Sequence, residues 1–317
     1  MRNQPHYSIV MKRFFLAIII AALAFPFQSE AKRPKPKAEY VVFIAIDGWA
    51  TQSFKDKVDN MPTVKYLMEN GCYTFHKRST MPSASAINWA TIFMGVPTEM
   101  HGYYKWNSSK PDIEAYALSD HGMPVTVYTL LSDQRPDRKS ACIYNWDGIG
   151  PVVDTLSMDY HLYDPGYHDK GGGYTLEKYT RNRAVKCIKE MRPNFFTFYI
   201  GDVDEAGHKY GWESEEYQKC LKETDEAIAI IIQALKDEGI YEKSIIVIGS
   251  DHGGKGKGHG GFTLEEMETP FVIFGKNVTK KGEMGFMMQY DLSATLAEAL
   301  GLKIPEEWRG HSMPVFK

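Results

Sequence analysis

Residues 40–48 read YVVFIAIDG, an unbroken apolar run that stops at an Asp-Gly pair. Such a short run, rich in β-branched and aromatic residues, predicts a strand buried on both faces of a parallel sheet. The pattern recurs in two later segments, which are 194–200 (NFFTFYI, before Asp202 and Asp204) and 244–248 (SIIVI, before Asp251). Since parallel strands end at one edge of their sheet, where such folds bind ligands, we expect these carboxylates to converge there.

Helical patterns alternate with these strands along the chain. The predicted helices are 61–70, 86–93, 125–132, 176–191, 215–237 and 290–300, and two further predicted strands are 141–144 and 269–275. Neither a repeat nor a change of composition divides the chain. We therefore predict one α/β domain, residues 32–317, with a central, mostly parallel sheet and helices on both faces. Residues 145–175 are expected to be irregular, and the Tyr- and Gly-rich stretch 160–174 serves either as a lid or as a surface covering.

Composition limits the classes of function. The chain has 317 residues, 43% of them hydrophobic, and a formal net charge of −3. This length and hydrophobic content allow a large core. The charge offers no basic footprint for a nucleic-acid polymer, so a small-molecule substrate is expected.

The N-terminus has the pattern of an export signal. Lys12 and Arg13 precede the apolar stretch 14–27, and Ser29-Glu30-Ala31 supplies small residues for a cleavage site. The stretch is shorter than the roughly 20 residues that span a membrane. We predict a signal peptide over residues 1–31, no stable membrane anchor, and a periplasmic or secreted mature protein.

Four cysteines give little evidence of a cysteine-based site. None belongs to a CxxC pair, which disfavours a cysteine zinc site. Four cysteines allow three disulfide pairings, and the sequence does not choose among them. Cys142 and Cys187 are predicted to be ordinary buried residues.

Histidines accompany two of the three groups of carboxylates. Asp204 and His208 are four residues apart, which places them on one face of a helical turn. Asp251 precedes His252 directly, and the glycine-rich run that follows is flexible enough to bring His259 back. Each piece alone has an ordinary explanation, such as a turn or a chance spacing. Placed after three strands, they together predict a site for a zinc-like cation.

A candidate nucleophile lies in residues 80–89, TMPSASAINW, which pass from a loop into a predicted helix. A hydroxyl at a helix N-terminus lies near unpaired N–H groups and the positive end of the helix dipole, which suits a phosphate. Ser83 and Ser85 both fit, and either one also fits a simple N-cap. Spacing alone does not separate them.

Taken together, these motifs resemble the alkaline phosphatase superfamily, and within it the type I phosphodiesterase/nucleotide pyrophosphatase branch. The resemblance covers nearly all of residues 32–317 and rests on five motifs: IAIDG (44–48), MPSASAINW (81–89), GDVDEAGHKYG (201–211), SDHGG (250–254) and GHGG (258–261). It implies an alkaline-phosphatase-like fold and two divalent metal ions, expected to be zinc. The implied activity is hydrolysis of phosphodiesters or nucleotide pyrophosphate bonds through a covalent phosphoseryl intermediate.

The resemblance also assigns roles, with one metal site made of Asp204, His208 and His259 and the other of Asp47, Asp251, His252 and the Ser85 oxygen. The family nucleophile lies three residues before an Asn, which selects Ser85 over Ser83 because Asn88 follows at that spacing. A family Asn that contacts a phosphoryl oxygen corresponds most closely to Asn107, offset by one residue. Ser85 replaces the more usual Thr, and Trp89 stands where this branch often has His.

The implied chemistry is an in-line displacement at phosphorus. One cation lowers the pKa of the Ser85 hydroxyl and the other stabilises the leaving oxygen, as metals about 4 Å apart can do. Asn107 and the helix N-terminus are expected to share the equatorial charge. Asp202 is left out of the ligand set because only Asp204 has the right spacing to His208.

Other readings remain open. A phosphomonoesterase is the closest alternative. Its substrate carries an additional negative charge, and the basic candidates for binding that charge are Arg135, Arg138 and Lys139. A sulfatase is disfavoured because Trp89 takes the place of the arginine in the sulfatase signature. A phosphoglycerate mutase is disfavoured because the chain lacks a second inserted domain. A non-catalytic metal- or glycan-binding relative is least favoured, since every ligand and a nucleophile are present.

Overall fold

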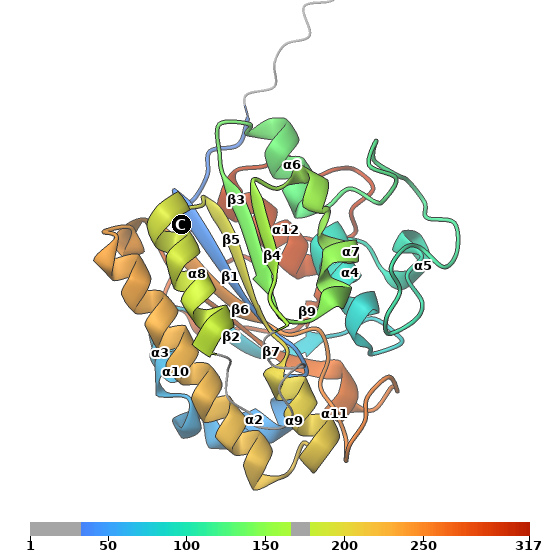
Figure 1. The fold of residues 1–317 in the computed structure, drawn as a ribbon, viewed down its shortest axis with the longest axis vertical. Helices are drawn as coiled ribbons and strands as arrows, with labels where there is room; N and C mark the ends of the chain where they lie inside the picture. The colour runs from blue at the N-terminus through green and yellow to red at the C-terminus, as the bar shows by residue number, and fades with distance from the viewer. Residues whose placement is uncertain (1–32, 166–177) are drawn as a thin grey trace, which may run out of the picture. The chain divides into compact units, whose positions relative to one another are not determined.

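The computed structural model describes residues 33–165 and 178–317. The predicted signal peptide lies outside the described residues, as do residues 166–174 of the Tyr- and Gly-rich stretch. The unit described below is Pro34–Lys317. Figure 1 shows its central sheet with helices on either side.

Strand β1 (Tyr40–Ile46) lies in the middle of the sheet, whose order is β4-β3-β5-β1-β6-β7-β2-β8 with β9 paired to β2. The strands are β2 (Cys72–Arg78), β3 (Ser140–Tyr144), β4 (Tyr160–Tyr163), β5 (Phe195–Ile200), β6 (Ser244–Gly249), β7 (Glu268–Gly275), β8 (Gly282–Glu283) and β9 (Met287–Met288). Strands β4, β3, β5, β1 and β6 are parallel to one another, and β7 runs antiparallel to both neighbours. The prediction of a mostly parallel sheet is confirmed.

Every residue of β1 is buried because helices cover both faces of the sheet. Val41 and Phe43 pack with α4, α6 and α12, whereas Val42 and Ile44 pack on the opposite face with α3, α8 and α10. The helices are α2 (Thr51–Phe54), α3 (Pro62–Asn70), α4 (Ser85–Met94), α5 (Thr98–His101), α6 (Val127–Gln134), α7 (Gly150–Val153), α8 (Lys178–Met191), α9 (Asp202–Tyr210), α10 (Glu215–Asp237), α11 (Leu264–Met267) and α12 (Gln289–Leu300).

Helix α10 shows how local sequence sets an element's bounds. The Ser214 side chain accepts a hydrogen bond from the Tyr217 N–H at 3.1 Å and caps the helix N-terminus. Gly239, with φ of +66°, follows the helix and adopts the left-handed conformation that commonly ends helices. The predicted bounds 215–237 are those of the structure.

The prediction that residues 145–175 are irregular is wrong for the first part of that range. It contains η2 (Asp147–Ile149), α7, η3 (Thr155–Ser157) and β4. Each of these elements has only three or four residues, too few to show a hydrophobic period. Strand β4 is largely exposed at the edge of the sheet, so it lacks the apolar run that marks the central strands.

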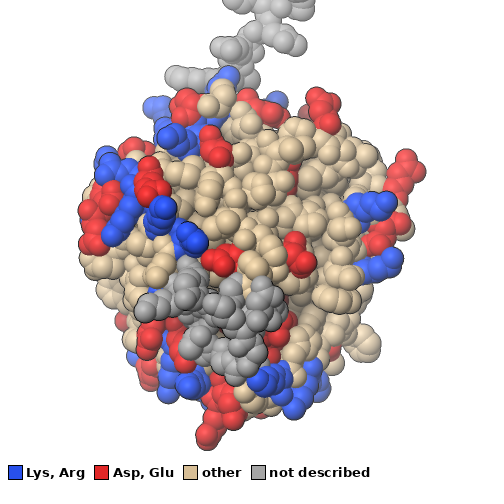
Figure 2. All heavy atoms as spheres, in the orientation of Figure 1, with Lys and Arg blue, Asp and Glu red and all other residues tan. Residues whose placement is uncertain are grey.

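The four cysteines are all buried free thiols, and Cys142 and Cys187 are buried as predicted. Within residues 33–165 and 178–317, no helix has the length and apolarity needed to cross a membrane. Acidic and basic side chains are interspersed on the face shown in Figure 2.

Candidate active site

The carboxyl ends of β1, β5 and β6 bring the predicted carboxylates together. Ile46 of β1 pairs with Ile200 of β5, and Ala45 pairs with Gly249 of β6, so the three strands end at nearly the same level. Asp47 follows β1 directly, Asp251 follows β6 after one residue, and Asp204 lies in the first turn of α9. Parallel register therefore creates the acidic cluster that the sequence predicts.

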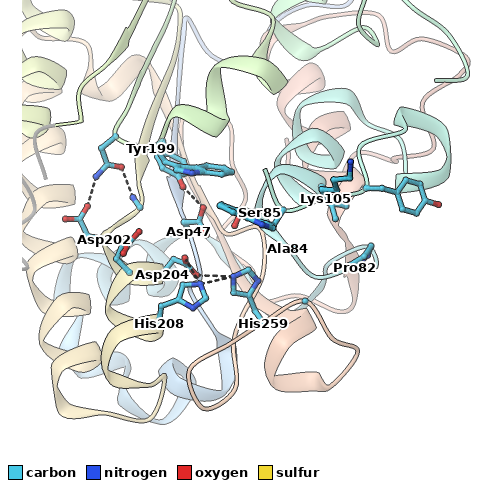
Figure 3. Close-up of a pocket in the computed structure, with 18 residues that line it drawn as sticks. Asp47, Pro82, Ala84, Ser85, Lys105, Tyr199, Asp202, Asp204, His208 and His259 are labelled. Atoms are coloured by element: carbon cyan, nitrogen blue, oxygen red, sulfur yellow. Dashed lines mark hydrogen bonds and ion pairs between the residues drawn. The ribbon is translucent and has the colours of Figure 1, made fainter. Parts of the chain in front are cut away.

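The first group of candidate ligands comes from α9 and the glycine-rich loop (Figure 3). Asp204 Oδ2 lies 3.3 Å from His208 Nε2, one helical turn later. The loop returns His259, whose Nε2 lies 3.1 Å from His208 Nε2 and 3.7 Å from Asp204 Oδ1. All three residues predicted for the first metal site are thus adjacent.

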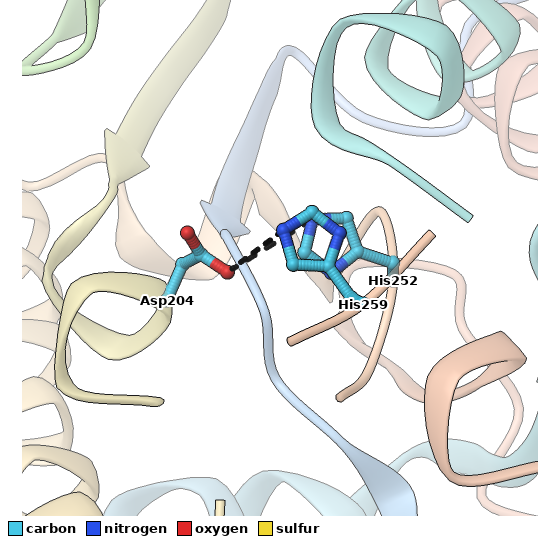
Figure 4. A group of neighbouring side chains, drawn as sticks. All are labelled: Asp204, His252 and His259. Atoms are coloured by element: carbon cyan, nitrogen blue, oxygen red, sulfur yellow. Dashed lines mark ion pairs between the residues drawn. The ribbon is translucent and has the colours of Figure 1, made fainter. Parts of the chain in front are cut away.

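The second group is centred on His252, which is fully buried. Its Nε2 lies 3.3 Å from Asp47 Oδ1, 3.2 Å from Asp251 Oδ2 and 3.0 Å from Ser85 Oγ. The two groups adjoin each other, because the His252 and His259 rings stack with centroids 3.6 Å apart beside Asp204 (Figure 4). The structure therefore brings together seven of the eight predicted site residues.

The histidine rings are oriented to present Nε2 to this cluster. Each Nδ1 faces a backbone carbonyl, with the pairs being His208 and Lys257 at 3.0 Å, His252 and Gly253 at 2.8 Å, and His259 and Ser83 at 3.0 Å. Because a carbonyl oxygen only accepts, each Nδ1 donates its proton there, and Nε2 is the nitrogen that faces the cluster. This is the arrangement usual for metal-ligating histidines.

Three carboxylate oxygens lack the partners that burial would otherwise require. Asp47 Oδ1, Asp204 Oδ1 and Asp251 Oδ2 are buried and receive no hydrogen bond from the described residues. Buried, unsatisfied polar atoms are costly, and anions more so. Imidazole lone pairs and carboxylate oxygens facing one another form a donor set that fits a divalent cation, so the residues present fit the predicted metals.

The titration of these groups reflects the same crowding. Burial, followed by the charge of Asp204, raises the pKa of Asp47 to about 6. Burial and the neighbouring Asp47 raise the pKa of Asp251 well above its ordinary value. Burial would also raise the pKa of Asp204, but the hydrogen bond from His208 and the nearby histidines hold it below its ordinary value. The same hydrogen bond raises the pKa of His208 to about 9.

Asn88 holds the nucleophile loop in place. Its buried side chain accepts a hydrogen bond from the Thr80 N–H at 2.8 Å and donates to the carbonyls of Pro82 at 3.0 Å and Ala84 at 3.2 Å. These bonds fix the loop up to Ser85, the first residue of α4. A buried amide whose groups are all satisfied rigidifies its surroundings.

The two candidate serines are separated by their contacts. Ser83 Oγ donates to the Gly261 carbonyl at 2.7 Å and accepts from the Gly260 N–H at 3.1 Å, so it secures the loop that carries His259. Ser85 Oγ instead faces His252 in the cluster. The structure thus places Ser85, and not Ser83, among the candidate ligands.

Asn107 is the predicted site residue that the structure does not bring to the cluster. It is exposed and is not among the described residues that line the cavity. The Trp106 carbonyl accepts from the Ala86 N–H at 3.0 Å, which docks residue 106 on the start of α4 and leaves the next residue outside. That contact also occupies the Ala86 N–H at the helix N-terminus, which was expected to share phosphoryl charge.

Sequence reasoning missed Asn145, which is buried and lines the cavity. It accepts from the Gly201 N–H at 2.9 Å and donates to Asp202 Oδ2 at 2.8 Å, which accounts for the place of Asp202 outside the metal-binding groups. A polar residue directly after the predicted strand 141–144 was the available signal. Asp47 stands in the same position after its own strand.

A cavity of about 750 Å³ opens over the cluster. Its wall includes Tyr104, Trp106, Trp146 and Tyr199. Among the described lining residues, Lys105 is the one Lys or Arg. The basic candidates Arg135, Arg138 and Lys139 precede β3, at the end of that strand opposite its carboxyl end, and are not in the described lining.

Comparison with known proteins places the site in a wider context. The family model described as type I phosphodiesterase / nucleotide pyrophosphatase matches residues 41–267. Rat ectonucleotide pyrophosphatase/phosphodiesterase family member 1 is 25% identical over 239 residues, covering 69% of this chain and 25% of the rat protein. A human bis(5'-adenosyl)-triphosphatase is 24% identical over 254 residues, covering 76% of this chain and 52% of the human protein. The chain therefore spans about half or less of these relatives' length.

Solved structures share the fold. Murine ectonucleotide pyrophosphatase/phosphodiesterase 5, solved as an inactive variant in complex with AMP, superimposes with a TM-score of 0.67 at 14% identity, over 85% of this chain and 97% of that chain. A 2-O GAG sulfatase gives a TM-score of 0.67 at 12% identity, over 89% of this chain and 73% of that chain. At these identities the similarity establishes the architecture and not the substrate.

Proposed function

Because the chain belongs to the type I phosphodiesterase/nucleotide pyrophosphatase family, we propose that it hydrolyses phosphate esters with Ser85 as the nucleophile. The observation that carries the proposal is the position of Ser85 Oγ, 3.0 Å from His252 Nε2 beside carboxylate oxygens that lack hydrogen-bond donors. A hydroxyl in such a cluster is the nucleophile expected when a bound cation replaces the missing donors.

The cluster divides into two proposed cation sites. One consists of Asp204, His208 and His259, and the other of Asp47, Asp251, His252 and Ser85 Oγ. His252 also lies close to Asp204 and His259, so it stands between the two sites. Mixed carboxylate and imidazole ligands suit zinc, which we propose as the metal. When bound, the two ions would lower the pKa of the Ser85 hydroxyl and neutralise charge on the transferred phosphoryl group.

The chain's own residues would then carry the reaction. Ser85 Oγ attacks phosphorus, the bond to the leaving oxygen breaks, and a covalent phosphoseryl ester forms. Water hydrolyses that ester in a second displacement and regenerates the Ser85 hydroxyl. Asn88 fixes the loop that presents Ser85, so the attacking oxygen keeps its position through both steps.

The cavity supports a small phosphodiester as the substrate, with nucleotides as the class we propose. Tyr104, Trp106 and Trp146 provide aromatic surface beside the phosphate position, and aromatic faces stack on bases. The AMP complex of the murine relative and the name of the human relative are consistent with this class. A phosphomonoester would leave one more negative charge to bind. The basic candidates near β3 lie outside the described lining, and Lys105, which lies in it, is already paired with Asp112 Oδ1 at 3.0 Å.

Two chromogenic substrates test this preference. We expect the p-nitrophenyl ester of thymidine 5'-monophosphate to be cleaved with kcat/KM at least about tenfold above that of p-nitrophenyl phosphate, a difference of about 1.4 kcal/mol in transition-state binding. The measurement is release of p-nitrophenol by zinc-loaded protein. A higher kcat/KM for the monoester would establish the phosphomonoesterase alternative. Cleavage of neither substrate would favour the non-catalytic relative.

We also propose that the protein is exported, on the evidence of the charged and apolar pattern before Ala31. Expression of the full sequence in a Gram-negative host should yield a periplasmic or secreted chain whose N-terminus is Lys32. Mass spectrometry of the purified protein gives the N-terminal residue directly. Recovery of an uncleaved chain from the cytoplasm would contradict the proposal.

A further inference from the structure

The two oxygens of Asp47 have different surroundings. Oδ2 accepts a hydrogen bond from Trp89 Nε1 at 3.0 Å and another from the Tyr199 hydroxyl. Oδ1 receives no hydrogen bond from the described residues and faces His252 Nε2 at 3.3 Å. One oxygen is thus held by the protein, while the other is left for a ligand.

The two donors are themselves fixed. Trp89 and Tyr199 are almost completely buried, and their rings meet edge to face with centroids 5.4 Å apart. Phe43 and Phe93 complete this aromatic layer beneath the site, at 6.3 Å and 6.2 Å from the Trp89 ring. Close packing leaves the indole and phenol little freedom to find another acceptor.

Trp89 also links Asp47 to the nucleophile. Ser85 and Trp89 lie on α4 four residues apart, so both project from the same side of the helix. The hydrogen bond from Trp89 to Asp47 therefore fixes the helix that begins with Ser85 against the end of β1. The Tyr199 hydroxyl, on β5, makes the second hydrogen bond to Asp47 and so ties the end of β1 to the neighbouring strand. Tyr199 also lines the cavity (Figure 3).

We propose that Trp89 and Tyr199 are positioning residues that hold Asp47 in one rotamer, so that Oδ1 alone faces the second cation at a fixed position relative to Ser85. The inference rests on the proposed function, because it assumes that Asp47 is a metal ligand. Residues that orient a ligand in this way typically contribute 10- to 100-fold, as an order of magnitude, to metal affinity or activity. A merely structural role would lower stability and leave the metal sites unchanged.

The test removes one donor at a time. Tyr199→Phe deletes only the hydroxyl, and Trp89→Phe deletes the indole N–H. Zn²⁺ dissociation constants are measured by competition with a chromophoric chelator, and the visible spectrum of the Co²⁺-substituted protein reports ligand geometry. We expect each variant to raise the Zn²⁺ dissociation constant of one site by about 10- to 100-fold and to alter the Co²⁺ spectrum. The dissociation constant of the other site should stay within about twofold of the wild-type value.

Matched controls come from the same core. Tyr128→Phe removes a buried hydroxyl that bonds to Thr197 Oγ1, and Trp308→Phe replaces a buried indole elsewhere in the core. Both controls should bind two ions as the wild type does. In the double variant of Trp89 and Tyr199, the loss of Zn²⁺ binding free energy should be smaller than the sum of the two single losses, because both donors bond to one carboxylate.

The outcomes separate the inference from the proposed function. If the wild type binds two ions and Tyr199→Phe binds both with unchanged affinity and spectrum, the inference is overturned. If the wild type binds no divalent ion, the proposed function itself fails. Should Trp89→Phe not fold, Tyr199→Phe alone decides, because it changes no packing volume beyond one oxygen.

Discussion

Replacing Ser85 with alanine is expected to reduce turnover of a nitrophenyl phosphodiester by on the order of 10⁴-fold or more, which is the usual scale for loss of a nucleophile. Ser85 Oγ lies 3.0 Å from His252 Nε2, beside carboxylate oxygens that receive no hydrogen bond from the described residues. Without it no phosphoseryl ester can form. Bound metal, measured by atomic emission, should remain near two ions per chain, because Asp47, Asp251 and His252 all persist.

Ser83→Ala is the matched control for this substitution. Both serines lie in the same loop and are nearly buried, but the Ser83 hydroxyl bonds to the backbone of residues 260 and 261. Its loss removes about 1 kcal/mol of hydrogen bonding, so we expect at most about a tenfold decrease in kcat/KM. If Ser83→Ala were inactive and Ser85→Ala retained full activity, the assignment of the nucleophile would be reversed.

The centre of the site could be predicted because it depends on short-range rules. Asp47 comes directly after a buried strand and Asp251 one residue after another, and parallel strands deliver such residues to one edge. Asp204 and His208 are one helical turn apart, so their proximity is a property of the helix alone. His259 needed only a flexible loop to return it, which the run of glycines supplies.

The parts that could not be predicted depend on contacts between distant segments. The exposed position of Asn107 could not be predicted, because sequence spacing does not reveal the hydrogen bond from the Ala86 N–H to the Trp106 carbonyl that docks the loop before it. The resemblance to the family selected Ser85 over Ser83, but the role of Ser83 depends on the loop at 260–261, almost 180 residues away. Strand β2 escaped prediction because its buried positions alternate with partly exposed ones and include a fully buried lysine, Lys77.

The partners of Trp89 illustrate the same limit. The sequence shows a tryptophan at an unusual position in the motif. The residues next to it in the sequence do not indicate which group accepts the hydrogen bond from its N–H. Asp47 is 42 residues away and meets Trp89 only because α4 packs on the face of the sheet next to β1. The local departure from the family pattern thus acquires a physical explanation only in the folded protein.

Removal of metal is expected to have an effect comparable to loss of Ser85. Exhaustive dialysis against a chelator should abolish turnover, and stoichiometric Zn²⁺ should restore it. The reason is that Asp47 Oδ1, Asp204 Oδ1 and Asp251 Oδ2 are buried and receive no hydrogen bond from the described residues. At a free ion concentration 1,000-fold above Kd, each site should add about 4 kcal/mol to the free energy of unfolding. Thermal unfolding of stripped and reloaded protein measures this difference. Full activity of a preparation with no detectable metal would contradict it.

The pH dependence of metal binding follows from the protons that the metal-free site holds. The hydrogen bond to Asp204 raises the pKa of His208 to about 9, so a cation must displace that proton at any pH below about 9. Burial raises the pKa of Asp47 to about 6 and that of Asp251 well above its ordinary value, so the carboxylates hold further protons that a cation must displace as the pH falls. Apparent affinity should therefore weaken as pH falls, by about tenfold per pH unit for each proton displaced, and more steeply below about pH 6. Chelator competition between pH 5 and 8 measures the slope. An affinity that does not change over this range would show that neither Asp47 nor His208 gives up a proton to the metal.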